Sequence, residues 1–216
     1  EKDPVTLLSK RVKAHVLGTP AATDRLVYEE KDDSFYMGLM RTRDDKFICI
    51  QLQSTVSTEQ RCTSAAKPGE FVVLAPRERD HLYNADHVGD HWVVRTNWQA
   101  PNYRLMRADD SAVGQGRSAW RDLVPHDPKA FIEDFAAFDR FLAIEERSEA
   151  NKRLRLVPAA GKGSFVTSDE PAYTMTLTSN PEVNATTLRY TYDSLTTPQR
   201  VFEVDVATGK RTLLKQ

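Results

Sequence analysis

Cysteine is scarce in this sequence of 216 residues, which contains only Cys49 and Cys62. A disulfide-rich scaffold would need more cysteines, and a cysteine metal site would need them in a tighter cluster. Cys49 lies in the apolar run 47–50, so we predict that it is a buried thiol without a chemical role. Because reduced thiols suit the cytoplasm, we expect a cytoplasmic location, with the periplasm as the alternative since the true N-terminus is not seen.

The sequence also lacks an excess of charge of either sign, because 30 Lys and Arg residues balance 31 Asp and Glu residues. A net charge of −1 gives no strong field to hold nucleic acid or an anionic membrane, so we expect neither as a partner. No stretch approaches the ~18 apolar residues that a membrane-spanning helix needs. The start at residues 1–4 (EKDP) has no signal-peptide pattern and is typical of the interior of a longer protein.

The sequence motif of a serine hydrolase is absent as well. A nucleophile of the α/β-hydrolase type sits in Gly-x-Ser-x-Gly on a sharp strand-to-helix turn, and no such pentapeptide occurs. Ser164 follows Gly163, but Val166 stands where the second glycine is required. We interpret Ser164 as a loop serine and predict that the chain carries no catalytic residue.

Metal and cofactor patterns are equally weak. His87 and His91 are four residues apart, but the residues Gly89-Asp90 between them predict a hairpin turn, which separates the two rings. The glycine pairs at 114–116 and 161–163 do not continue into a phosphate-binding fingerprint, so we interpret both as turns. We therefore expect no metal and no cofactor.

Helical periodicity is scarce, and short apolar runs take its place. The best helical candidate, residues 131–138, is equally consistent with a strand. Elsewhere Val, Ile, Tyr and Phe gather in runs of about five residues, bounded by turn clusters such as 42–45, 87–90 and 207–210. Such runs between turn signals predict strands joined in hairpins.

These strands recur in a fixed order of inner, second, third and outer. The expected positions, by residue number, are 35, 82, 131 and 173 for inner strands, 47, 92, 141 and 188 for second strands, 61, 104, 153 and 201 for third strands, and 72, 120, 165 and 213 for outer strands. The period is about 45 to 49 residues, which is typical of propeller blades of four strands each. One such sheet has two apolar faces, and stacking neighbours around an axis buries them.

Two further strands, at 12–17 and 25–28, match the third and outer positions of a preceding unit. The fold class is therefore all-β: a partial β-propeller of about four and a half four-stranded blades, forming one domain over residues 1–216. A sandwich of stacked hairpins is the structural alternative, because sandwiches also have short strands at regular spacing.

Several segments are more specific than the repeat. They are 28–33 (YEEKDD), 54–59 (STVSTE), 180–182 (NPE) and the tail 188–216 (LRYTYDSLTTPQRVFEVDVATGKRTLLKQ). Together they resemble the propeller region of the prolyl oligopeptidase family of serine peptidases, in its oligopeptidase B (protease II) branch, over the whole chain.

The resemblance implies a seven-bladed propeller paired with an α/β-hydrolase domain that this chain does not contain. It implies that the propeller limits access to a buried serine-protease site, so that only short peptides are cut. In the oligopeptidase B branch cleavage follows Arg or Lys, so short basic peptides are the expected substrate of the parent protein. The hydrolase domain of the parent chain is the expected partner.

The resemblance also suggests which loops meet the hydrolase domain. If the chain leaves the propeller after an outer strand, the contact face carries the outer-to-inner and second-to-third loops. On that basis we expect five residues on the domain-contact face: Arg77, Arg79, Arg147, Thr197 and Pro198. The alternative is that they are solvated turn residues. The acidic pairs 29–30 and 145–146 are expected at strand ends, in solvent or paired with neighbours such as Arg147.

Two other functions stay open at this point. A stand-alone propeller could serve as a protein-binding platform, although such a platform should begin with a whole blade. An independent hydrolase with an unrecognised site is the third alternative. A partial ring exposes an apolar face at each end, so we also expect the isolated fragment to self-associate.

Overall fold

A computed structural model describes residues 1–159 and 163–216, so two residues of the expected turn at 161–163 lie outside the described residues. The described part is built from strands, with three short 3₁₀ turns: η1 (Ala21–Thr23), η2 (Asp110–Ala112) and η3 (Arg117–Ala119). In this part of the chain no helix is long and apolar enough to cross a membrane.

Four units of four antiparallel strands follow one another along the chain. Their strands are, in blade 1, β3 (Tyr36–Arg41), β4 (Phe47–Gln53), β5 (Thr58–Ser64) and β6 (Val72–Val73); in blade 2, β7 (Tyr83–Val88), β8 (His91–Thr96), β9 (Arg104–Asp109) and β10 (Arg121–Val124); in blade 3, β11 (Phe131–Ala137), β12 (Phe141–Ser148), β13 (Asn151–Pro158) and β14 (Ser164–Phe165); in blade 4, β15 (Tyr173–Leu177), β16 (Thr187–Ser194), β17 (Arg200–Asp205) and β18 (Arg211–Lys215). The predicted order and spacing of the strands are confirmed, and residues 131–137 form a strand.

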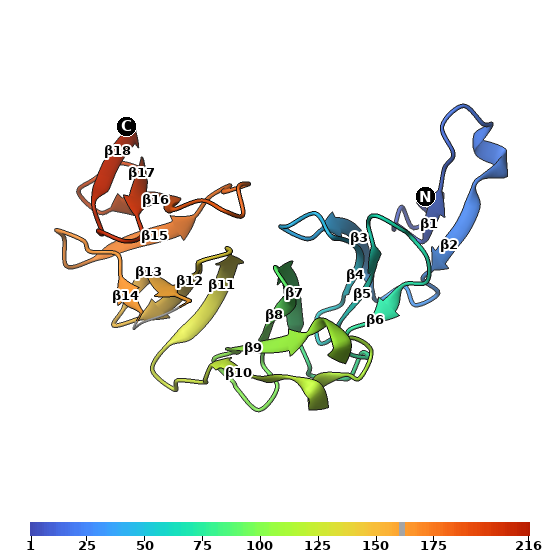
Figure 1. Ribbon diagram of the computed structural model, residues 1–216, viewed down its shortest axis with the longest axis horizontal. Helices are drawn as coiled ribbons and strands as arrows, with labels where there is room; N and C mark the ends of the chain where they lie inside the picture. Colours follow the sequence, from blue (N-terminus) through green and yellow to red (C-terminus); the bar gives the residue numbers. More distant parts are fainter. Residues whose placement is uncertain (160–162) are drawn as a thin grey trace.

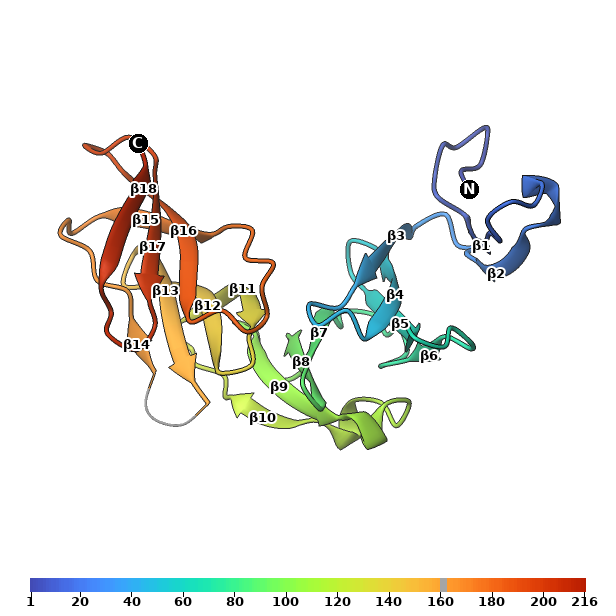
Figure 2. The ribbon, with the colours of Figure 1, turned by 45° about the horizontal axis from the view of Figure 1, so that its top comes forward.

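A half-blade precedes blade 1, as predicted. It consists of β1 (Arg11–Ala14) and β2 (Arg25–Glu29), which pair antiparallel in the third and outer positions. The units are arranged along an arch with the two chain ends at opposite tips (Figure 1). A second view shows the half-blade standing at the N-terminal end of this arch (Figure 2).

Two of the outer strands are very short, and for β6 the local sequence explains this. β6 and β14 have only two residues each. Before β6 the chain reads Lys67-Pro68-Gly69, and proline and glycine both disfavour a continued ladder. Second strands are long and apolar because their two faces are covered by different neighbouring blades; β12 begins FLAI, and all four of these residues are buried.

Apolar clusters lie between successive sheets, which is the arrangement of a propeller. Trp92 of blade 2 is fully buried in a cluster that includes Cys49 of blade 1. Ile144 of blade 3 shares a cluster with Val93 of blade 2, and Tyr190 of blade 4 shares one with Leu154 of blade 3. Each junction therefore has its own core, so the partial propeller is confirmed and the single sandwich is excluded.

The junction between blades 1 and 2 also contains directional hydrogen bonds. The side-chain amide of Gln60 accepts from the Ala85 N–H at 3.0 Å and donates to the Ala85 carbonyl at 2.9 Å. The Tyr83 hydroxyl accepts from the Gln60 N–H at 2.8 Å and donates to the Ala75 carbonyl at 2.8 Å. Buried polar groups with good partners fix a single geometry, and here they fix how blade 2 sits on blade 1.

Cys49 and Cys62 form a disulfide, so the prediction of a free thiol at Cys49 is wrong, although the residue is buried as expected. The register of β4 and β5 places the two cysteines directly opposite each other, with 4.1 Å between their Cα atoms. The support that reduced thiols gave to a cytoplasmic location is thereby lost, and the compartment stays a prediction.

Candidate functional site

The second-to-third and outer-to-inner loops share one face of the arch, which we call face A; the remaining loops form face B. In blade 1 the Asp80 N–H donates to the Val56 carbonyl at 2.8 Å, and the Thr58 N–H donates to the His81 carbonyl at 3.2 Å. In blade 3 the Asn151 amide reaches the Pro171 carbonyl at 3.0 Å. The loops expected on the domain-contact face therefore lie together. Four candidate residues come from these loops, and the fifth, Arg147, lies near the end of β12, next to the loop that follows it.

Arg77 belongs to a face A loop, but its side chain points into a junction. It lies 2.8 Å from the Glu30 carboxylate of the half-blade connection and 3.4 Å from the Glu59 carboxylate of β5. Its guanidinium carbon lies 3.9 Å from the centre of the Phe35 ring. Both carboxylate side chains are only 5% exposed, so Arg77 is a structural cation that joins the half-blade to blade 1.

Opposing effects set the protonation states of Glu30, Arg77 and Tyr28. Burial disfavours the charge of Glu30, but hydrogen bonds from Arg77, Asp32 and Tyr28 outweigh it and hold the pKa of Glu30 below its usual value. Burial likewise disfavours the charge of Arg77, yet the bonds to both glutamates raise its pKa. Burial and the neighbouring Glu30 raise the pKa of Tyr28 to about 12. The ion pairs therefore stay charged at neutral pH.

Arg79 and Arg147 are the candidates that are free to touch another domain. The Arg79 side chain is 81% exposed and has only Asp80, 3.7 Å away, as an acidic neighbour. Arg147 is 61% exposed, and its Nε donates to Glu133 at 2.9 Å. Exposed pairs of this kind contribute little to stability, so both guanidinium groups can change partner at small cost.

Thr197 is held in place by a carboxylate that the sequence did not indicate. Glu170, in the loop before β15, accepts hydrogen bonds from Ser194 at 2.5 Å and from Thr196 and Thr197 at 2.6 Å. A fourth bond comes from Tyr192 at 3.1 Å. These donors lower the pKa of Glu170 to about 2, and they fix the loop 194–197.

The tip of this fixed loop is presented to solvent. Leu195 is 98% exposed, and Pro198 is exposed beside it. The structure thus brings Thr197 and Pro198 together on an ordered, partly apolar knob of face A. Arg147 lies in the neighbouring blade, and Arg79 lies further along the arch, in the connection between blades 1 and 2.

The sequence predicts the acidic pair at 145–146 at a strand end, in solvent or paired with neighbours such as Arg147. Pairing with neighbouring cations is confirmed, whereas exposure to solvent and Arg147 as the partner are wrong. Glu145 and Glu146 are 5% and 2% exposed. Glu145 lies 2.6 Å from Lys152, and Glu146 lies 2.8 Å from Arg155, both on β13. Because β12 is covered on both faces, its carboxylates need cations from the adjacent strand.

Histidine chemistry is structural in the described residues. His87 is fully buried, with one ring nitrogen 2.7 Å from Asp44 and the other 2.8 Å from Asp110. Residues 1–159 and 163–216 contain no cluster of three or more potential metal ligands. Ser164 is an exposed residue of β14, paired with Leu156 of β13, and has no hydrogen-bonded histidine beside it.

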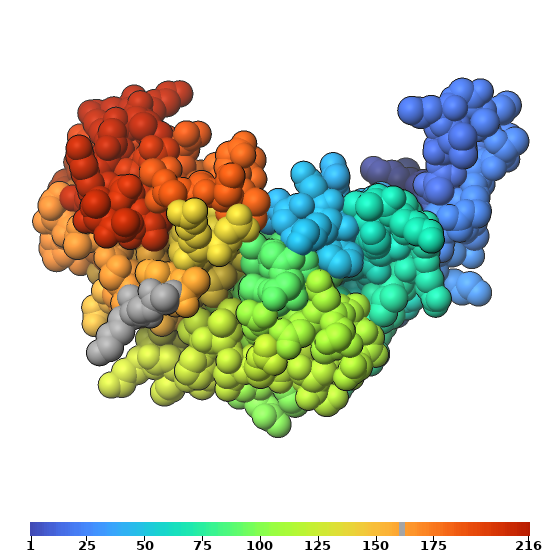
Figure 3. Space-filling view, viewed as in Figure 1, coloured from blue at the N-terminus to red at the C-terminus, as the bar shows by residue number. Residues whose placement is uncertain are grey.

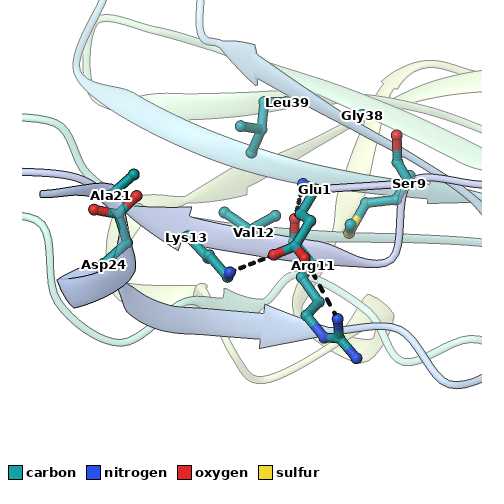
Figure 4. Close-up of a pocket in the computed structure, with 10 residues that line it drawn as sticks. Glu1, Ser9, Arg11, Val12, Lys13, Ala21, Asp24, Gly38 and Leu39 are labelled. Atoms are coloured by element: carbon teal, nitrogen blue, oxygen red, sulfur yellow. Dashed lines mark hydrogen bonds and ion pairs between the residues drawn. The ribbon is translucent and has the colours of Figure 1, made fainter. Parts of the chain in front are cut away.

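A cavity lies at the open side of the half-blade. It has a volume of 570 Å³ and lies between β1 and β3 (Figure 4). Its walls carry the ion pairs of Glu1 with Lys13 and Arg11. These groups form no nucleophile–base pair, and the cavity marks the unpaired edge of a two-stranded sheet.

Stacked four-stranded sheets with structural ion pairs at their junctions define a β-propeller domain. All of residues 1–216 match the family described as "Prolyl oligopeptidase, N-terminal beta-propeller domain". The chain therefore belongs to the prolyl oligopeptidase family, as part of its N-terminal propeller.

Named relatives and solved structures agree with this assignment. Dipeptidyl aminopeptidase BI from Pseudoxanthomonas mexicana is 55% identical over 217 residues, covering 100% of this chain and 30% of that protein. Protease 2 from Moraxella lacunata is 26% identical over 93% of this chain and 29% of its own length. Oligopeptidase B from Trypanosoma brucei, in a closed form with bound antipain, has a TM-score of 0.89 and 26% identity over 99% of this chain and 32% of its own. The chain thus spans about a third of the length of these proteins.

The contrast between Arg77 and Arg79 gives a first prediction. Arg77→Ala leaves Glu30 buried without its cation, so we expect a loss of about 3 kcal/mol in the free energy of unfolding. The matched control Arg79→Ala, two residues away on the same loop, should cost less than about 0.5 kcal/mol. Urea denaturation of both variants measures the difference; equal stability of the two variants would refute the structural role of Arg77.

The Glu170 cluster gives a second prediction. The pKa of Glu170 in the folded protein is about 2, below the ordinary value of 4.5. The stabilising effect of this carboxylate is therefore complete above pH 4.5 and is lost as the pH falls towards 2. NMR of the amides of residues 194–197 should show an ordered loop at pH 5 that loosens between pH 4 and 2. In Glu170→Gln the loop should already be loose at pH 5, while the exposed control Glu182→Gln should match the unsubstituted protein.

Proposed function

We propose that this chain is the non-catalytic propeller portion of an oligopeptidase B-like serine endopeptidase that cleaves short peptides after Arg or Lys. The propeller packs its face A on the α/β-hydrolase domain and gates access to the active site. The observation that carries the proposal is the match of the whole arch to oligopeptidase B of Trypanosoma brucei, at a TM-score of 0.89 over 99% of the chain.

Gating follows from the mechanics of stacked blades. Each junction buries its own apolar core, so the innermost strands cannot separate without exposing that core to water. A rigid ring above a reaction site therefore admits a narrow, extended peptide and rejects a folded protein. The exposed Arg79 and Arg147, with the 194–198 knob, are the groups of face A that we assign to the hydrolase contact.

A second specificity is favoured by a particular observation. The relative at 55% identity is named a dipeptidyl aminopeptidase, and its similarity is well above that of the oligopeptidase B structures. Removal of dipeptides from a free N-terminus is therefore the alternative activity for the parent protein. In that case the propeller would still restrict access to the active site, and the position at which the substrate N-terminus is held would determine which bond is cleaved.

Activity assays on two forms of the protein test the proposal. The full-length parent should hydrolyse an N-blocked fluorogenic peptide ending in Arg, and its Gln counterpart should be cut at least about a hundredfold more slowly. The isolated 1–216 chain should give no turnover. Cleavage restricted to dipeptide substrates with a free N-terminus would favour the alternative, and turnover by the isolated chain would refute the non-catalytic role.

We further propose that the isolated chain self-associates through the two ends of the arch. Leu26 of the half-blade is 48% exposed, and Leu213 and Leu214 of β18 are 46% and 45% exposed. Both ends also offer unpaired strand edges. Light scattering after size-exclusion chromatography should show dimers or larger species. We expect fewer of these species for Leu214→Lys than for the control Leu17→Lys, which changes an exposed loop tip. A monomer at every protein concentration would contradict the proposal.

A further inference from the structure

Arg43 of blade 1 contacts residues of the three other blades. It lies in the face B turn between β3 and β4, and its backbone N–H donates to the Asp86 carboxylate of blade 2 at 2.8 Å. Its side-chain Nε lies 3.7 Å from the second Asp86 oxygen. Blade 1 is thus bound to blade 2 through this residue before its guanidinium group is considered.

The guanidinium group continues across the concave side of the arch. It donates a hydrogen bond to the Asn180 carbonyl of blade 4, and its carbon lies 4.7 Å from the centre of the Phe138 ring of blade 3. The space-filling view shows the blade 1 turn and the blade 4 loop meeting in the middle of the molecule (Figure 3). One side chain therefore links all four blades.

The acceptor on blade 4 is itself held rigidly. The Asn180 side chain donates to the Thr178 carbonyl at 2.8 Å and to the Arg189 carbonyl at 2.9 Å. It also accepts from the Arg189 N–H at 2.7 Å. In addition, the Asp139 N–H of blade 3 donates to the Val183 carbonyl of the same blade 4 loop at 3.0 Å. Arg43 therefore binds a fixed point.

Arg43 lies where burial disfavours its positive charge, so it is not a turn residue surrounded by solvent. The Arg43 side chain is 18% exposed, and burial lowers its pKa although Asp86 and Asp134 act in the opposite direction. Burial also raises the pKa of Asp86. Its neighbour Arg41 shows the ordinary case: that side chain is 59% exposed and faces only Asp45, 3.3 Å away.

We propose that Arg43 is a cross-axis brace that sets the spacing between blades 1 and 4 on face B. By fixing this spacing it limits how far the innermost strands open, and so limits the length and bulk of the peptide that can pass between them. The brace is a positioning residue, since it acts through the distance between blades. Its effect on substrates depends on the proposed function, whereas its effect on the spacing does not.

A distance measurement tests the brace directly in the full-length parent protein. Spin labels are placed at Asp45→Cys and Glu182→Cys, two exposed positions on the opposing loops, with the natural cysteines already paired in this domain. We expect Arg43→Ala to lengthen and broaden the distance distribution, and Arg43→Lys to do so less. Arg41→Ala, which removes a nearby exposed cation, should leave it unchanged. An unchanged distribution in Arg43→Ala would overturn the proposal.

Kinetics on the same variants show whether the spacing matters for substrates. We expect kcat/KM for a peptide of about thirty residues to rise at least about threefold in Arg43→Ala, with kcat for a short fluorogenic peptide unchanged. A parallel loss on both substrates would overturn the selective role. If the unsubstituted parent cleaves no peptide, the proposed function fails, and the distance distributions still decide the brace. Should Arg43→Ala fail to fold, Arg43→Lys carries both measurements.

Discussion

Burial of each sheet against the next is the constraint on which the rest of the structure depends. A four-stranded sheet with apolar residues on both faces has no stable form alone, and roughly 25 cal/mol is gained for each Å² of apolar surface removed from water. Trp92, Ile144 and Tyr190 are fully buried, and each lies in a cluster shared by two blades. Charged groups at the junctions, such as Arg77 with Glu30, are tolerated because the ion pair and its hydrogen bonds offset the cost of removing water from them.

Much of the fold could be predicted because hairpins are local. Short apolar runs between turn clusters fix each strand, and their recurrence at about 45 to 49 residues fixes the repeat. The half-blade was visible for the same reason. Two strands at the start matched the third and outer positions of a unit whose other strands were missing, and β1 and β2 occupy those positions.

The errors have a common cause, which is register and contact between strands. The sequence prediction treats Cys49 without reference to Cys62, yet the two cysteines lie at equal distances from the β4–β5 turn. Strand pairing outward from that turn places them opposite each other. The candidate site was harder to predict. The role of Arg77 depends on Glu30, 47 residues away, and Arg43 meets Asn180 across 137 residues. No spacing rule reports such pairs, because they arise only when the blades stack.

The bonds of Gln60 and Tyr83 have a consequence for how such a chain avoids folding errors. Similar sheets built by repetition could exchange places, since apolar faces alone are poor at telling one neighbour from another. The Gln60 amide pairs with both backbone groups of Ala85, and a sheet that offered no free backbone pair at this position would leave the buried amide unsatisfied. A single buried polar side chain such as Gln60 can therefore favour the correct order of blades during the assembly of a repeated architecture.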